Sequence, residues 1–171
     1  VVLDKTGTVT QGVPSLTDVV PSEGLTSEDL LRFTAAVETN SEHPLGRAIV
    51  DAAQARGVDY GRAQEFVVMP GWGVSATVEG RQVLVGTTAF LAEAGVEVAE
   101  LERQSAVLAE DGRTPIVASL DGRPLGVLGI SDPVKDDSRA AVRRLQALGK
   151  RVVILTGDHE AAGRAAARAA G

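Results

Sequence analysis

Short aliphatic runs mark the two ends of the chain. Residues 1–3 and 152–155 are uninterrupted apolar stretches, and each stops at a turn that contains acidic, hydroxyl and glycine residues. Strands that are buried on both faces of a parallel sheet have this pattern. Parallel strands end at the same edge of a sheet, so we expect Asp4 and Thr156 to meet there although they are distant in sequence.

The next part of the chain predicts helices. Apolar positions recur on one face of residues 27–37, which predicts a helix. Thr26 and Asp29 at its start fit a capping box. A second helix is predicted over residues 44–56, with proline in its first turn and Gly57 beyond its end. Further helices are predicted at residues 89–93, 99–109 and 138–148.

The apolar period then changes from that of a helix to that of a strand. Residues 74–78 alternate between apolar and polar side chains, and after a turn at Gly80-Arg81 the apolar positions continue through residues 83–85. This alternation predicts a hairpin. Two further strands are predicted at residues 116–120 and 125–130, bounded by turns at Asp111-Gly112 and Asp121-Gly122.

These elements together predict an α/β protein in two parts. Residues 1–20 and 125–171 are expected to form a partial parallel sheet with helices, and residues 21–124 an inserted α+β module with an antiparallel sheet. The first part is therefore discontinuous in sequence.

Composition excludes several classes of function. A hydrophobic content of 44% is ordinary for a globular fold, and a net charge of −6 argues against a nucleic-acid partner. The chain contains no cysteine and only two histidines, which are too few for a convincing zinc site. No apolar stretch is long enough to cross a membrane. Any bound metal is expected to be a hard cation with oxygen ligands.

The two turns at the predicted sheet edge carry candidate chemistry. In Asp4-Lys5-Thr6-Gly7, a carboxylate at a strand tip can bind a cation or act as a nucleophile, although such a turn can also merely end a strand. In Thr156-Gly157-Asp158 the hydroxyl can bind a phosphoryl oxygen, or the segment can simply cap a helix. Convergence of both turns on one edge favours a phosphoryl site.

The sequence DKTGT at residues 4–8 resembles the phosphorylation signature of the P-type ATPases, which are members of the haloacid dehalogenase superfamily. The resemblance implies a haloacid dehalogenase-like fold, with Asp4 as the nucleophile that becomes an aspartyl phosphate. It implies Mg²⁺ bound by Asp4 and by the backbone oxygen of Thr6. Lys5 and Mg²⁺ would offset the charge that otherwise repels ATP.

Two later segments resemble signatures of the same family. Thr156-Gly157-Asp158 resembles the TGD segment, which implies that Thr156 acts at the phosphoryl group and Asp158 at the nucleotide. Asp132-Pro133-Val134-Lys135 resembles the family's hinge segment, and Asp132 is carried over as a nucleotide-site residue.

Residues 41–45, SEHPL, resemble the signature of heavy-metal-transporting P-type ATPases. The resemblance assigns adenine contacts to Glu38 and His43. These two residues would face different directions on one continuous helix, but Pro44 disfavours helical dihedrals at His43, so a bend can turn both toward one cavity. Without the resemblance, His43 reads as a loop residue at a helix start.

Glycines further along resemble the nucleotide-contacting glycines of that subclass. Gly71 and Gly73 flank Trp72, which we expect to pack across the hairpin, and Gly86 precedes Thr87 where the family usually has asparagine. Missing side chains at Gly71, Gly73 and Gly86 would let a nucleotide approach the backbone. Thr87 either replaces the amide contact or only caps the following helix.

The resemblance also implies what the chain works with. The expected ligands are ATP or ADP with Mg²⁺, and the expected partners are the membrane and actuator domains of an ATP-driven heavy-metal pump, at the cytoplasmic face of the cell membrane. Copper is the expected ion from the frequency of that subclass, with zinc, cadmium and cobalt left open. The family's later Mg²⁺-binding loop is not in this sequence, so we expect nucleotide binding without turnover.

Two alternatives stay open. A free-standing phosphatase of the superfamily typically has a second aspartate two residues after the nucleophile, where this chain has Thr6. The second alternative is a pure nucleotide-binding or regulatory module with no chemistry.

Overall fold

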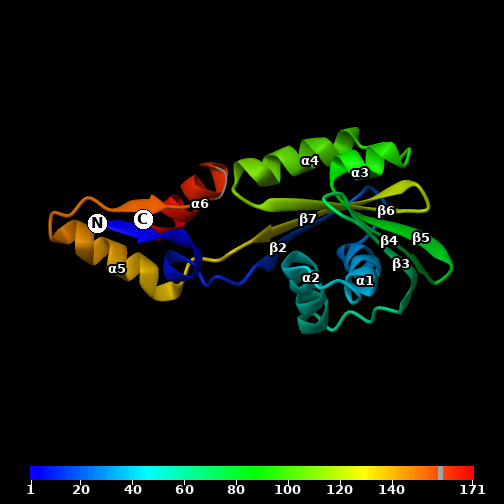
Figure 1. The fold of residues 1–171 in the computed structure, drawn as a ribbon, viewed down its shortest axis with the longest axis horizontal. Helices are drawn as coiled ribbons and strands as arrows, with labels where there is room; N and C mark the ends of the chain where they lie inside the picture. The colour runs from blue at the N-terminus through cyan, green and yellow to red at the C-terminus, as the bar shows by residue number, and fades with distance from the viewer. Residues whose placement is uncertain (158–159) are drawn as a thin grey trace.

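The structure, a computed structural model, describes residues 1–157 and 160–171. It has a six-stranded antiparallel sheet with helices on both faces, beside a smaller unit built on a two-stranded parallel sheet (Figure 1). The strands are β1 (Val2–Asp4), β2 (Ser15–Pro21), β3 (Ala63–Met69), β4 (Gly73–Val78), β5 (Arg81–Gly86), β6 (Thr114–Leu120), β7 (Arg123–Ser131) and β8 (Val153–Leu155). The helices are α1 (Ser27–Glu38), α2 (Pro44–Ala55), α3 (Thr88–Glu93), α4 (Ala99–Glu110), α5 (Asp136–Ala147) and α6 (Glu160–Ala170).

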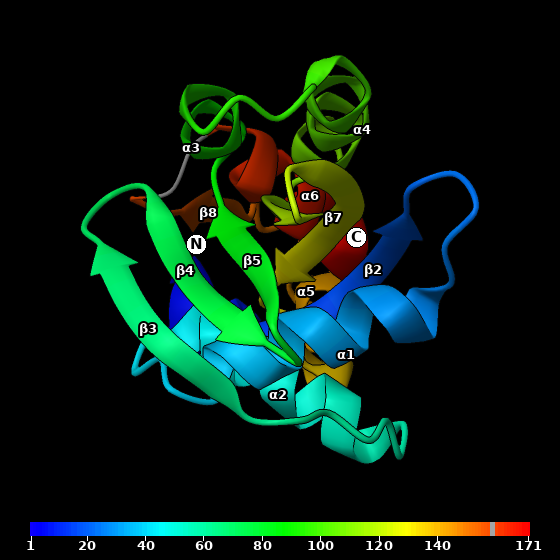
Figure 2. The same ribbon diagram turned by 90° about the vertical axis from the view of Figure 1, so that its right-hand side faces the viewer.

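The antiparallel sheet has the strand order β2-β7-β6-β5-β4-β3. Helices α1 and α2 cover one face and α3 and α4 the other, as the two perpendicular views show (Figures 1 and 2). Each face of the sheet has its own hydrophobic core. One core includes Leu30 and Val37 of α1 and Ile49 of α2, and the other includes Phe90 of α3 and Leu101 of α4.

Tight turns fix the register of two hairpins. Glu79 and Gly80 have φ values of 53° and 75°, and Asp121 and Gly122 have φ values of 48° and 74°. Two successive residues with positive φ form the turn whose twist matches paired strands. The first turn is therefore centred on Glu79-Gly80, one residue earlier than predicted, because Arg81 already pairs with Val78.

The parallel sheet joins the two ends of the chain. Strand β1 pairs with β8, with Leu3 opposite Ile154 and Asp4 opposite Leu155. Helices α5 and α6 pack against this unit, around a small core that includes Val9, Val142 and Ala170. The predicted architecture is confirmed: an α/β unit with a parallel sheet carries an inserted antiparallel module.

The predicted boundaries at residues 20 and 125 cut through β2 and β7. These two strands pair with each other along their length, and β7 pairs with β6, so residues 15–21 and 123–131 belong to the antiparallel sheet. The sheet therefore extends beyond residues 21–124 on both sides, and the chain passes between the units at residues 10–14 and 132–135. The division into two domains stays a prediction.

The turn between α4 and β6 touches the smaller unit. Gly112, with φ of 78°, lies so close to α6 that a Cβ atom there would overlap the Cβ of Ala165 and lie 3.0 Å from the carbonyl oxygen of Ala161. A cavity of about 220 Å³ lies beside this contact, lined by residues of both units that include Lys5 and Asp132.

The predicted capping box at the start of α1 is present. The backbone N–H of Asp29 donates to Thr26 Oγ1 (3.1 Å), and the backbone N–H of Thr26 donates to Asp29 Oδ2 (3.0 Å). Both groups would otherwise be unpaired donors at the helix end.

We expect Thr26→Ala to lower the free energy of unfolding by about 1 kcal/mol, because it removes one side of this box. Urea unfolding followed by circular dichroism measures the change. Ser27→Ala, at the next position, is the control and should change stability by only a few tenths of a kcal/mol. Equal losses in both variants would contradict the assignment.

Candidate functional site

Asp4 and Thr156 lie at the same edge of the parallel sheet. Asp4 is the last residue of β1 and pairs with Leu155, the last residue of β8, so Thr156 follows directly beside it. Asp4 is exposed and Thr156 is half-buried. The expected meeting of the two turns is therefore observed, whereas Asp158 lies outside the described residues.

The loop after Asp4 is held in shape by its own backbone. Gly7 takes a φ of 75°, and the backbone N–H of Thr10 donates to the carbonyl oxygen of Lys5 (2.9 Å), with Thr10 Oγ1 3.0 Å from the same oxygen. Lys5 is buried and Thr6 is exposed. Asp4 and Thr6 are thus exposed residues at the start of one hydrogen-bonded loop.

Asp132 makes contacts other than the predicted ones. Its Oδ2 accepts from Thr10 Oγ1 (2.5 Å) and its Oδ1 accepts from the backbone N–H of Gly12 (2.8 Å). Both carboxylate oxygens thus hold the segment that leaves the Asp4 loop. The role of Asp132 at the nucleotide stays a prediction.

Lys135, the last residue of the hinge-like segment, contacts the Asp4 loop, for which the sequence assigned it no role. The Nζ of Lys135 donates to the carbonyl oxygen of Gly7 (2.5 Å), and its backbone N–H donates to the carbonyl oxygen of Val9 (3.0 Å). Ser138 Oγ also donates to the Val9 carbonyl (2.8 Å). The hinge-like segment at residues 132–135 was the available signal, but only the fold shows that it clamps the Asp4 loop.

The second group of predicted residues lines one cleft of about 440 Å³ in the antiparallel module. Glu38, His43, Gly71, Gly73 and Gly86 all contribute to its wall. Its other lining residues are Ser41, Leu45, Gly46, Val68, Met69, Pro70, Trp72, Val74, Val85, Thr87, Thr114, Pro115 and Ile116.

The register places this cleft at one particular end of the sheet. Gly73 at the start of β4 pairs with Gly86 at the end of β5, and Gly86 pairs with Val117 in β6. At that same end Thr114 pairs with Ile130, next to the point where β7 leads into the Asp4 edge. The cleft therefore lies at the sheet end from which the chain passes to the Asp4 edge.

Glycine at positions 73 and 86 is required by the strands themselves. A Cβ on Gly73 would overlap the carbonyl oxygen of Val85, and a Cβ on Gly86 would overlap that of Trp72. Gly71 differs, because its φ of 79° suits the turn and no atom lies within 4 Å of a Cβ placed there. Close backbone packing thus explains two of the three glycines without any ligand.

His43 caps α2 and faces the cleft. Its Nδ1 accepts a hydrogen bond from the backbone N–H of Leu45 (3.2 Å), so in the neutral ring the proton is on Nε2. The helix breaks between Glu38 at the end of α1 and Pro44 at the start of α2. This bend brings both residues to one cavity, as expected.

Glu38 is a buried acid, only 7% exposed. Burial raises the pKa of its carboxyl, and a hydrogen bond with the Ser41 side chain opposes part of that shift. A carboxyl kept protonated by its surroundings can donate as well as accept a hydrogen bond.

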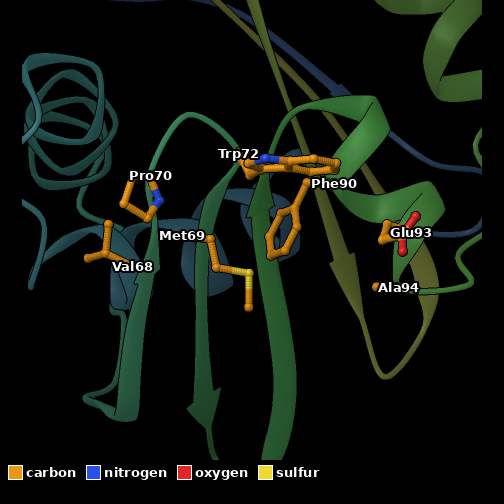
Figure 3. Close-up of a pocket in the computed structure, with 7 residues that line it drawn as sticks. All are labelled: Val68, Met69, Pro70, Trp72, Phe90, Glu93 and Ala94. Carbon is orange, nitrogen blue, oxygen red and sulfur yellow. The ribbon is translucent and has the colours of Figure 1, made fainter.

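A second, more open cavity of about 670 Å³ adjoins the cleft (Figure 3). Trp72 and Met69 line both cavities, and Phe90 and Glu93 of α3 lie on the far side of this one. Trp72 is 45% exposed and lies beside Phe90. Thr87 Oγ1 accepts from the backbone N–H of Phe90 (3.1 Å), so it caps α3.

Within the described parts of the chain, no group of three or more acidic or histidine side chains could hold a metal ion. Residues 1–157 and 160–171 also contain no helix whose length and apolar character would let it span a bilayer.

Comparison with known proteins shows the family to which the chain belongs. A family model described as haloacid dehalogenase-like hydrolase matches residues 1–171. The chain is 42% identical over 171 residues to copper-transporting ATPase 2 of Rhizobium meliloti and to the copper-exporting P-type ATPase of Bacillus subtilis, covering 100% of this chain and 21% of each relative. A solved zinc-transporting PIB-type ATPase superimposes with a TM-score of 0.89 at 32% identity, over 98% of this chain and 27% of that chain.

The chain belongs to the haloacid dehalogenase-like hydrolase family. Within it, the relatives are heavy-metal P-type ATPases, so the resemblance predicted from the motifs at residues 4–8 and 41–45 is confirmed. The chain spans about a fifth of the length of those relatives.

We expect Glu38→Gln to remove a pH-dependent cost to stability. The raised pKa means that the folded state holds a proton that the unfolded state releases, so the free energy of unfolding of the parent chain falls as pH rises above about 4. The glutamine side chain of the variant does not titrate, so its stability lacks this dependence on pH. The stability difference between the variant and the parent should therefore grow in favour of the variant from pH 4 to pH 7.

Urea unfolding at a series of pH values measures this difference. Glu42→Gln, which changes an exposed carboxyl in the same loop, is the matched control. Stability curves of the Glu38→Gln variant and the parent that run parallel with pH would contradict the burial argument.

Proposed function

We propose that this chain is the ATP-binding and phosphorylation region of an ATP-driven heavy-metal cation pump. The observation that carries the proposal is the position of the cleft containing Glu38 and His43, at the sheet end that leads to the Asp4 edge. A nucleotide whose base contacts these two residues can extend its phosphates toward Asp4.

In the proposed reaction the Asp4 carboxylate attacks the γ-phosphorus of ATP. A bond forms between Asp4 Oδ and phosphorus while the bond from phosphorus to the β-γ bridging oxygen breaks, and ADP leaves. Lys5, beside the nucleophile, and Thr156, across the sheet edge, are the proposed groups that offset and orient the charge of the transferring group.

The residues at the edge fit Mg²⁺ only in part. The Asp4 carboxylate and the backbone oxygen of Thr6 are hard oxygen ligands of the kind that Mg²⁺ prefers, and Mg²⁺ commonly keeps several waters and binds substrate phosphates. Bound there, the ion would neutralise charge on the phosphates. Asp4 and Thr6 alone make an incomplete protein site.

Transport and its partners are part of the same proposal. The relatives are described as copper-transporting, copper-exporting and, in Salmonella typhimurium, silver-exporting ATPases, and one solved neighbour transports zinc. We therefore assign a heavy-metal ion as cargo, with copper favoured. Membrane and actuator domains of the same pump would be the partners, with this region at the cytoplasmic face of the membrane.

Replacement of His43 tests the nucleotide site. We expect His43→Asn to weaken binding of ATP and ADP about tenfold, as the loss of one or two hydrogen bonds would. Asparagine is a good N-cap, so this variant keeps the helix start that His43→Ala would lose. Calorimetric titration with each nucleotide gives the affinities. Thermal unfolding shows whether each variant keeps the stability that the N-cap of α2 provides.

Undiminished affinity in His43→Asn, with a loss only in His43→Ala, would show that the histidine acts as a cap and not as a ligand. Absence of nucleotide binding by the parent chain would overturn the proposed function itself.

We expect this chain by itself to bind ATP without steady hydrolysis, because its Mg²⁺ site is incomplete. Phosphate release assays measure turnover, and Asp4→Asn is the control because it removes the nucleophile and nearly preserves shape. Steady hydrolysis that is lost in Asp4→Asn would contradict this expectation. An acid-stable phosphate on Asp4, formed when the whole pump is given ATP, would support phosphoryl transfer over a non-catalytic module.

A further inference from the structure

A glycine in the first turn of α2 lies directly against the buried carboxyl of Glu38. Gly46 follows Pro44 and Leu45 in that turn and is itself buried. A Cβ atom there would overlap Glu38 Oε2, and would lie 3.1 Å from Glu38 Cδ and 3.0 Å from Ser41 Oγ. The nearest atoms all belong to the acid and to its hydrogen-bonding partner.

The backbone gives no reason for glycine at this position. Gly46 is not among the glycines with positive φ, so its dihedrals are open to any residue. Alanine in a helix interior is more favourable than glycine by about 1 kcal/mol. At this position, however, the methyl group of alanine would meet the Glu38 carboxyl. Gly46 therefore differs from Gly73 and Gly86, where an added Cβ would meet backbone atoms.

The contact also lies at the right place to affect a ligand. Glu38, Ser41 and Gly46 line the same cleft, with the carboxyl between α1 and the first turn of α2. The obstructed atoms are the far end of a flexible side chain, so an added methyl group would move the carboxyl and leave the helix in place.

We propose that Gly46 is a positioning residue, whose missing side chain sets the Glu38 carboxyl where it meets the base of the bound nucleotide. The inference rests on the proposed nucleotide site. Gly46 touches no substrate in this scheme and acts only through Glu38. Burial of that carboxyl in the space beside Gly46 accounts for the direction of its pKa shift.

The test is a double-mutant cycle on ADP affinity. In the parent chain, Gly46→Ala should weaken ADP binding roughly fivefold or more while the thermal midpoint is kept, because the fold has gained a better helix former. In a Glu38→Ala background, where the carboxyl is gone, the same change should have almost no further effect. Arg47→Ala, at the next and exposed position of α2, is the control and should leave affinity unchanged.

Equal losses from Gly46→Ala in both backgrounds, or no loss in the parent chain, would overturn the proposal. A readout without nucleotide separates it from the proposed function: titration of the Glu38 carboxyl by carbon NMR should move toward its ordinary range in Gly46→Ala. If the parent chain bound no nucleotide but this titration moved, the proposed function would fail while the packing of Gly46 on Glu38 would stand. An unmoved titration would overturn the packing argument.

Discussion

The parallel pairing of β1 with β8 joins segments from opposite ends of the chain, and the edge that holds Asp4 and Thr156 depends on it. The Val1 amine donates to the carbonyl oxygen of Arg151 (2.7 Å), across a sequence separation of 150 residues. Closing so long a loop in an unfolded chain costs conformational entropy. The inserted module reduces that cost, because pairing of β2 with β7 brings residues 15 and 131 together and leaves only short connections to close.

The same arrangement explains why the hinge segment has so many hydrogen bonds to the Asp4 loop. The small parallel unit has few buried apolar residues, whereas the antiparallel module has two cores. Asp132, Lys135 and Ser138 supply polar contacts to residues 7–12. These contacts fix the loop that follows Asp4, in a unit with few buried apolar residues to hold it.

Features determined by local physics could be predicted from the sequence. The Thr26 capping box, the turn at Asp121-Gly122 and the proline at the start of α2 each depend on neighbouring residues, and each is observed. The strands β2 and β3 were not predicted. Both are edge strands, and Glu65 with φ of 52° interrupts the alternation of β3. Such strands carry a weak apolar period.

Contacts between distant segments account for what the sequence could not show. The glycines at 73 and 86 were read as openings for a ligand, but their pairing across the hairpin is what excludes a side chain. Gly46 carried no local signal and Lys135 was marked only as part of the hinge-like segment, because the fold alone brings them to their partners Glu38 and Gly7. The family resemblance indicated the candidate sites, and the fold supplied their geometry.

The approach of Gly112 to α6 limits how the two units can move about their connections at residues 10–14 and 132–135. Backbone already meets a helix surface of alanines there, so the two units cannot come closer at this point without steric overlap. Any side chain at position 112 would have to push the two units apart, and the absence of one is what allows this close contact.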